Sequence, residues 1–207
     1  MYRYAVNVGR PREHDEQTRR ELLSAAEHLL AGTGPEGLSV RAIADAAGTT
    51  TRAVYSVFGS RAGLLDALAM QLFDQLVAAI DAVPRSDDPV ADLVNASVQG
   101  FRAVMLAHEP VFRLVFRDVL PGLGAEVVAA GDVAFARMQQ LVARVLPAGT
   151  PAGRVHEAAL AVHSLTEGLA AVELRGGLGG PRVAKRVWGQ SVAALAAGWT
   201  APARPNL

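Results

Sequence analysis

The chain contains no cysteine and carries no net charge, and each absence excludes a class of protein. Without cysteine, the 207 residues cannot form a disulfide scaffold, a thiolate nucleophile, a cysteine-bound zinc site or an iron–sulfur cluster. Any metal site would have to use histidine and carboxylate ligands. Because 20 basic and 20 acidic side chains balance, no overall field attracts the protein to nucleic acid, so such binding would have to be local.

Long apolar runs are absent as well. The first 20 residues carry five arginines with no apolar stretch between them, which argues against a secretory signal. No later stretch reaches roughly 18 uncharged apolar residues, about the length that spans a bilayer. We therefore expect a cytoplasmic protein that has no membrane partner.

Hydrophobic residues make up 51% of the chain, enough for one sizeable core or for a small domain joined to a larger one. Between glycine and proline breaks their spacing follows a helical period, which predicts an all-α fold. Short helices come first, and long helices follow after about residue 65. We expect helices near residues 15–32, 39–47, 50–57, 60–82, 88–107, 110–118, 124–146, 153–175 and 182–199.

Residues 38–58 have the spacing of two short helices joined by a tight turn. Ser39 can cap the first helix, and Gly48 can adopt the left-handed conformation that ends it. Thr49 or Thr50 can then cap the second helix. A small residue inside the first helix, a four-residue gap, a glycine and later apolar positions are typical of a helix-turn-helix motif.

This motif resembles the DNA-binding domain of the TetR family of transcriptional regulators. The resemblance covers about the first third of the chain, and the sequence differs from the usual pattern at Thr49, Thr51-Arg52 and Arg61. It implies a three-helix helix-turn-helix domain over residues 15–65 and a larger helical domain for ligand binding and dimerisation over residues 66–200. It is carried by Leu38-Ser39-Val40-Arg41-Ala42-Ile43-Ala44-Asp45-Ala46-Ala47-Gly48, followed by Tyr55, Phe58, Ser60, Arg61 and Leu64-Leu65.

The composition around the second short helix suits contact with phosphate. In residues 46–65 no side chain is acidic, two are arginines and six carry hydroxyls. Arg52 could bond guanine O6 and N7 together, and Arg61 could bind backbone phosphate at the start of the next helix. We predict DNA contacts from Arg41, Thr49, Thr50, Thr51, Arg52, Tyr55, Ser56, Ser60 and Arg61.

Plainer explanations exist for parts of this pattern. Short alanine-rich helices with a glycine turn also occur in proteins that never meet DNA. Tyr55 could be a half-buried packing residue, and Arg41 could be a solvated surface residue. Arg10 and Arg12 could enter a minor groove or belong to a tail without function.

Aromatic residues and methionines share the apolar faces of the helices expected after residue 88. Such side chains, with a few polar groups among them, line small-molecule cavities, and they also fill ordinary cores. Both interpretations stay open. As ligand-binding candidates we name Phe101, Met105, His108, Phe112, Phe116, Phe135, Met138, His163 and Glu167, and the TetR resemblance implies an effector of unknown identity.

The helix expected over residues 154–174 is apolar nearly all round, so it should be covered on more than one side. One stripe includes Ala159 and Val162, and the other includes Leu160 and His163. A monomer of this size has little material left to cover both. We therefore expect the last two helices to pack against their copies in a homodimer, as the resemblance also implies. Two recognition helices roughly 34–36 Å apart would then read a palindromic operator.

His156, His163 and Glu167 lie on one face of that helix, and the last two have the i, i+4 spacing that can share a cation. A hydrogen-bonded pair in a pocket or at the dimer seam is the simpler explanation, so we predict no metal and no cofactor. The sequence thus favours a ligand-responsive repressor. The alternatives are an α-helical adaptor and a small helical enzyme, although no nucleophile elbow, phosphate loop or paired-carboxylate motif supports the enzyme.

Overall fold

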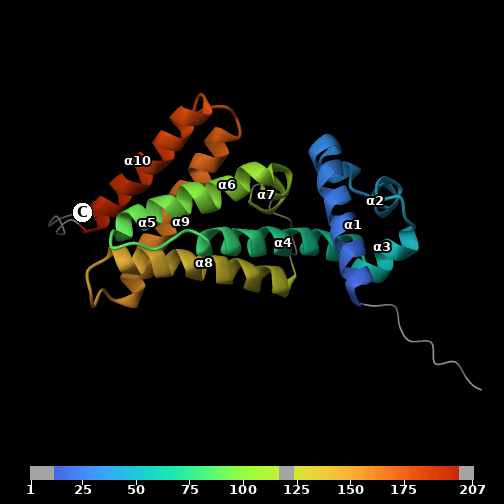
Figure 1. The fold of residues 1–207 in the computed structure, drawn as a ribbon, viewed down its shortest axis with the longest axis horizontal. Helices are drawn as coiled ribbons and strands as arrows, with labels where there is room; N and C mark the ends of the chain where they lie inside the picture. Colours follow the sequence, from blue (N-terminus) through green and yellow to red (C-terminus); the bar gives the residue numbers. More distant parts are fainter. Residues whose placement is uncertain (1–11, 117–123, 201–207) are drawn as a thin grey trace, which may run out of the picture. The chain divides into compact units, whose positions relative to one another are not determined.

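In a computed structural model of the protein, the described residues are 12–116 and 124–200, and the side chains of residues 12–15 are left aside (Figure 1). The described residues form helices and connecting turns, with no strand among them, so the all-α prediction is confirmed. Contacts divide the chain into two compact units, with the boundary between Leu68 and Ala69. The boundary predicted from the sequence lies after residue 65.

The helices correspond closely to those expected, with a π-helix (η2) and a 3₁₀ turn (η1) in addition. The expected N-terminal arm with Arg10, the side chain of Arg12 and the end of the helix predicted over residues 110–118 lie outside the described part. The elements are α1 (Arg12–Thr33), η1 (Pro35–Gly37), α2 (Val40–Ala46), α3 (Thr51–Phe58), α4 (Arg61–Asp81), α5 (Pro89–Asn95), η2 (Ala96–Phe101), α6 (Arg102–Ala107), α7 (Glu109–Phe116), α8 (Ala125–Val145), α9 (Ala152–Glu173) and α10 (Pro181–Thr200).

Unit 1 is built around the apolar faces of α1, α2, α3 and the first turns of α4. Its fully buried side chains include Leu22, Leu38, Ile43 and Val54, which come from three of these helices and from the residue just before α2's cap. Helix α1 packs on both α2 and α3. These contacts give the short helices α2 and α3 the tertiary support that helices of seven and eight residues need in water.

The turn between α2 and α3 has the predicted helix-turn-helix chemistry. Ser39 Oγ accepts a hydrogen bond from the Ala42 amide at 3.1 Å, and Thr50 Oγ1 accepts one from the Ala53 amide at 3.2 Å. Gly48 lies in the left-handed region with φ 62°, where a Cβ would be strained. The predicted Ser39 cap and turn glycine are therefore confirmed, and Thr50 rather than Thr49 caps α3.

Unit 2 packs its long helices around a buried indole. Helix α8 contacts α9 and α5, and α10 contacts α5, α9 and η2 (Figure 1). Trp188 of α10 is 0% exposed. Its Nε1–H donates to Glu173 Oε2 at 2.7 Å, and the same carboxylate accepts two hydrogen bonds from Arg102. One carboxylate thereby joins α6, α9 and α10.

The helix expected over residues 88–107 is interrupted by the π-helix η2. Gly100 lies in it, against α4: a Cβ at this position would stand 3.0 Å from Ile80 Cγ1 and 3.2 Å from Ile80 Cα. Glycine therefore permits a close approach of η2 to α4. A π-helix also shifts the side chains that follow it relative to an α-helix, and Phe101, the last residue of η2, is buried.

Helix α4 is the one helix of the described part that has the length and composition of a membrane span, with a mean hydropathy of 1.4 over its most apolar window. Half of that window is buried inside the protein. Asp66 and Asp74 also interrupt its apolar residues. A helix that is partly buried inside the protein can meet the same criteria of length and composition.

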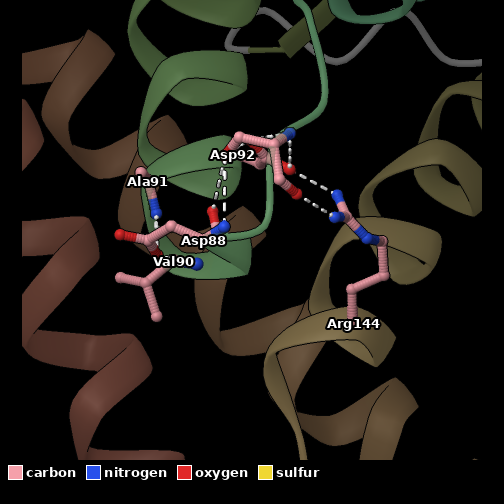
Figure 2. A network of polar contacts seen from close by, with 6 residues as sticks. Asp88, Val90, Ala91, Asp92 and Arg144 are labelled. Atoms are coloured by element: carbon pink, nitrogen blue, oxygen red, sulfur yellow. Dashed lines mark hydrogen bonds and ion pairs between the residues drawn. The ribbon is translucent and has the colours of Figure 1, made fainter.

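A buried carboxylate ties the start of α5 to α8 (Figure 2). Asp92 accepts hydrogen bonds from the Ser86 amide at 3.0 Å and from the Ser86 hydroxyl at 2.8 Å, and it forms an ion pair with Arg144 at 2.5 Å. Asp88 caps α5 by accepting from the Val90 and Ala91 amides at 3.0 Å. Chiefly the Ser86 amide, and then the Arg144 guanidinium, lower the pKa of Asp92 from an ordinary 3.8 to about 2.

This lowered pKa predicts an acid-sensitive part of the stability. The charged form of Asp92 is favoured in the folded state, so its contribution is complete above the unfolded pKa and is lost as pH falls from about 4 through about 2. We expect Asp92→Asn to be less stable than the wild type at pH 7, with the gap narrowing toward pH 2.5 in urea unfolding. The exposed neighbour Asp87→Asn is the control. A gap that stays constant with pH would contradict the prediction.

Candidate nucleic-acid interface and ligand cavity

Helix α3 is held at both ends and along its inner face. Thr50 caps its start, and Gly59, with φ 72°, ends it. Val54 and Phe58 are buried, and the Arg19 guanidinium lies 5.3 Å from the centre of the Phe58 ring. The sequence reasoning did not identify this cation–π contact with α1, because it joins residues far apart in the chain. The result is a short helix whose outer face is presented by a supported scaffold.

The outer face of α3 carries the predicted contact residues. Thr51, Arg52, Tyr55 and Ser56 are all exposed. Tyr55 is 53% exposed, which differs from the alternative that it packs half-buried in the core. Within the described residues no hydrogen bond or ion pair engages Arg52, so its guanidinium fork is available to an external acceptor.

The other predicted DNA contacts are placed less uniformly. Thr49 is half-buried. The hydroxyl of Thr50 is used as the cap of α3, and the hydroxyl of Ser60 accepts from the Gly63 amide at 3.0 Å, at the start of α4. Arg41 is exposed, and its Nε lies 3.9 Å from Asp45 Oδ2, a loose surface pair that offsets part of its charge.

Arg61 has a role that the sequence did not predict. Its Nε donates to the Leu38 carbonyl at 2.7 Å, and its Nη2 donates to the Pro35 carbonyl at 2.7 Å. The side chain thus ties the start of α4 to the loop that precedes α2. This use of the guanidinium differs from the expected grip on a phosphate, and Arg61 is left out of the proposed DNA contacts below.

We expect Arg61→Ala to lower the free energy of unfolding by about 1–3 kcal/mol, because two bonds from a charged donor are lost. Arg61→Lys should restore little of this, since one ammonium cannot reproduce the two-pronged guanidinium geometry. Urea unfolding measures the effect. If Lys instead restored wild-type stability, or if Arg61→Ala weakened only DNA binding, the structural role would be wrong.

Unit 2 contains a cavity of about 380 Å³ between α4, η2, α7, α8 and α9. Five of the predicted ligand-binding residues line it: Phe101, Phe116, Phe135, Met138 and His163. A volume of this size is within the range of small-molecule sites. The structure therefore contains a cavity at this aromatic cluster. The sequence alone did not distinguish a cavity from a filled core.

Four other candidates do not line this cavity. Met105 is buried in the core, and His108 is half-buried elsewhere. Phe112 and Glu167 line a second cavity of about 360 Å³ between α7 and α9. These four residues therefore lie apart from the aromatic cavity, and their part in ligand binding stays a prediction.

Helix α4 contributes lining residues that were not predicted from the sequence. Phe73, Leu76 and Ile80 line the cavity at i, i+3 and i+7. The sequence predicted that α9 packs against its copy in a homodimer, without assigning either of its two stripes to that contact. His156, Leu160 and His163 from the second stripe line the cavity, and of these only His163 was among the ligand-binding candidates. The helical spacing of these three α4 residues could have indicated that they share one apolar face. Only the packing of the helices shows that this face meets a cavity.

The polar groups of the cavity lie on α9 and α8. His163 Nε2 lies 3.0 Å from Glu167 Oε1, the hydrogen-bonded pair that was the alternative to a metal site. His156 Nδ1 lies 3.0 Å from Gln139 Nε2. Within the described part of the chain, no three histidine or carboxylate side chains come together as metal ligands do.

Two family models match the chain. The model described as bacterial regulatory proteins, tetR family, matches residues 22–68, and the model described as Tetracyclin repressor-like, C-terminal domain, matches residues 94–195. The first match begins within α1 and ends within α4, and the second includes η2, α7, α8 and α9, four of the five elements around the cavity.

Curated relatives match part of their own length. HTH-type transcriptional regulator Rv1816 of Mycobacterium tuberculosis is 30% identical over 122 residues, 57% of this chain and 51% of that protein. Tetracycline repressor protein class C of Escherichia coli is 29% identical over 153 residues, 72% of this chain and 63% of the repressor. The alignment thus spans about half of the mycobacterial relative.

Solved structures share the fold over nearly the whole chain. A protein of unknown function from Rhodococcus sp. RHA1 has a TM-score of 0.75 and 25% identity, covering 96% of this chain and all of that one. A tetR-family transcriptional regulator from Streptomyces coelicolor has a TM-score of 0.72 and 23% identity, covering 89% and 82%. Since both parts of the sequence match models of one family and the fold agrees, the protein belongs to the TetR family of bacterial regulatory proteins.

Proposed function

We propose that the protein is a DNA-binding transcriptional regulator that reads a palindromic operator as a homodimer and is released as a repressor when a small molecule fills the unit 2 cavity. The outer face of α3 is the main support for this proposal. It presents Arg52 and three hydroxyl-bearing side chains on a helix capped at both ends, without a carboxylate in residues 46–65. Family membership favours such a regulator over the enzyme and adaptor alternatives.

Direct readout is assigned to Arg52, and backbone contact to the residues around it. A guanidinium can bond guanine O6 and N7 together, and threonine methyl groups can touch thymine. Tyr55 and Ser56 would bind phosphates that flank the bases. The local positive charge of this segment supports such contacts although the whole chain is neutral.

We assign dimerisation to α9 and α10. Ser164 and Gly168 of α9 and Ala194 and Gly198 of α10 are exposed, small residues that allow two helices to approach closely. These residues are not among the α9 side chains that line the unit 2 cavity. A twofold pair would place two copies of α3 on one operator.

Helix α4 is the proposed link between cavity and DNA-binding unit. Its residues Phe73, Leu76 and Ile80 line the cavity, and at its other end Arg61 holds the carbonyl just before α2. A ligand acts only if it prefers one position of α4 over another. A preference of about 1–3 kcal/mol would change operator affinity by about 5–150-fold.

Selection from a random duplex pool tests the proposal. We expect the full-length protein to enrich an inverted repeat whose half-sites are about one helical turn apart. Affinity for the selected duplex should fall steeply with salt, because phosphate contacts release counterions. Recovery of no common sequence, or of a sequence without twofold symmetry, would contradict the proposal.

A further inference from the structure

The unit 2 cavity is lined by aromatic rings and contains no basic side chain other than histidine among its described lining residues. Phe73, Phe101, Phe116 and Phe135 come from four different elements, α4, η2, α7 and α8. The one carboxylate in the lining is Asp132 of α8. The cavity is therefore mainly apolar, and its fixed charge is negative.

The aromatic rings hold one another in edge-to-face positions. The centroids of Phe73 and Phe116 are 5.9 Å apart at 69°, and those of Phe101 and Phe116 are 6.4 Å apart at 74°. Rings fixed in this way present both edges and faces to an occupant. A planar aromatic molecule can pack against either, with a gain beyond the burial of its surface.

Two imidazoles supply the polar contacts, and their internal partners define what each can offer. The Gln139 amide nitrogen donates to His156 Nδ1, so the proton of a neutral His156 is on Nε2, which can donate. The Glu167 carboxylate accepts from His163 Nε2, so Nδ1 of a neutral His163 can accept. Within the described residues, neither of these two remaining nitrogens has a hydrogen-bond partner.

The charge of the lining selects among ligand classes. A carboxylate or phosphate ligand would lose its hydration beside Asp132, without an arginine or lysine in the lining to pair with it. A cation would also have to be desolvated against four phenylalanines. The exposed Asp132 attracts it weakly because water screens the charge. An uncharged ligand avoids both costs.

We infer that the cavity takes an uncharged aromatic molecule with a hydroxyl or carbonyl group that bonds His156 or His163. This inference rests on the proposed function, because it names the chemical class of the effector. Four phenylalanines bind the ring system, and the two imidazoles bind the single polar group. The lack of arginine and lysine in the described lining discriminates against anions, and the screened Asp132 carboxylate adds a small repulsion.

A matched set of ligands tests the inference by calorimetric titration of the full-length protein at pH 8 without DNA. The probes are 2-naphthol, naphthalene, 2-naphthoate and 2-naphthylmethylammonium, which share one ring system and differ in polar group and charge. We expect 2-naphthol to bind about tenfold more tightly than either charged probe and about threefold more tightly than naphthalene. Equal or tighter binding of a charged probe, or no binding by any of the four, overturns the inference.

Two variants test whether the ligands bind in this cavity and whether Asp132 contributes to the preference for an uncharged ligand. Asp132→Asn should reduce the preference for 2-naphthol over 2-naphthoate by about threefold, because the repelling charge is gone, whereas Glu126→Gln, an exposed carboxylate on the same helix, should leave the ratio unchanged. Ala134→Phe should fill the cavity and abolish binding of 2-naphthol. Unchanged ratios in Asp132→Asn, or full binding in Ala134→Phe, overturn the inference.

The ligand class and the DNA-binding function can be refuted independently. If the protein selects an inverted repeat but prefers a charged probe, only the ligand class is wrong. If 2-naphthol binds with the expected preference but no duplex is selected, the ligand class stands and the DNA-binding function is wrong.

Discussion

Glu173→Ala is expected to lower the free energy of unfolding by about 3–5 kcal/mol, the cost of breaking a buried ion pair by removing one partner. The side chains of Arg102 and Glu173 are only 12% and 11% exposed. Without the carboxylate, the guanidinium of Arg102 and the indole N–H of Trp188 both lose their partner inside unit 2. A loss of this size is a large fraction of the stability of a typical domain.

Urea unfolding followed by circular dichroism measures this effect, and Asp81→Ala is the matched control. Asp81 pairs with Arg137 at 3.1 Å, but their side chains are 45% and 34% exposed, so we expect a loss of no more than about 1 kcal/mol. The double variant Arg102→Met with Glu173→Leu should be milder than Glu173→Ala, because no unpaired charge remains. If Glu173→Ala and Asp81→Ala lowered the free energy of unfolding equally, burial of the ion pair would not determine the loss of stability.

Arg52→Ala is expected to weaken binding to the selected operator by about 2–6 kcal/mol, which corresponds to a loss of roughly 30-fold to more than 10⁴-fold in affinity. One bidentate contact with guanine is worth about 1–3 kcal/mol, and a twofold dimer loses it in both half-sites. The folded state should be unaffected, because Arg52 is exposed and makes no hydrogen bond or ion pair among the described residues.

Fluorescence anisotropy with the selected duplex measures the loss, and a single-base substitution in each half-site shows whether Arg52 reads it. Arg85→Ala, an exposed arginine in the loop before α5, is the control and should bind as the wild type does. Arg41→Ala should have an intermediate effect, since its charge is partly offset by Asp45. Wild-type affinity in Arg52→Ala would remove this residue from the proposed interface.

The helix-turn-helix motif could be predicted because its determinants are local. The caps at Ser39 and Thr50 each bond an amide three residues away, and Gly48 ends α2 through its own backbone conformation. Interactions of this range are encoded by residue type at adjacent positions. The same holds for Asp88 at the start of α5, where the sequence placed a helix boundary.

The internal hydrogen bonds of Arg61 show what local reasoning cannot provide. A basic residue in the first turn of a helix after a DNA-reading motif is a reasonable phosphate ligand, and nothing in neighbouring positions indicates otherwise. Its acceptors are the carbonyls of Leu38 and Pro35, which lie 23 and 26 residues earlier. Backbone carbonyls carry no side-chain signal, so a sequence pattern cannot identify them as partners.

The cavity illustrates the same limit on a larger scale. The aromatic cluster could be identified from its helical spacing, but not whether it encloses space. Phe116 lines both cavities, whereas Phe112, four residues earlier on α7, lines only the second. Which face of a helix meets a cavity depends on how α4, α8 and α9 pack, and small rotations of a helix exchange one neighbour for another.

By itself, the amino-acid sequence determined the all-α class, the approximate bounds of the helices and the helix-turn-helix motif of α2 and α3 with its exposed Arg52. These features arise from hydrophobic period, capping and turn residues, which act over a few positions. Only the tertiary structure showed that Arg61 bonds to the segment before α2 and that Glu173 joins three helices. Likewise, only the tertiary structure showed that His156 and His163 of α9 line a cavity. The physical reason is that these contacts join residues far apart in the chain, whose separation is set by packing and not by spacing along the sequence.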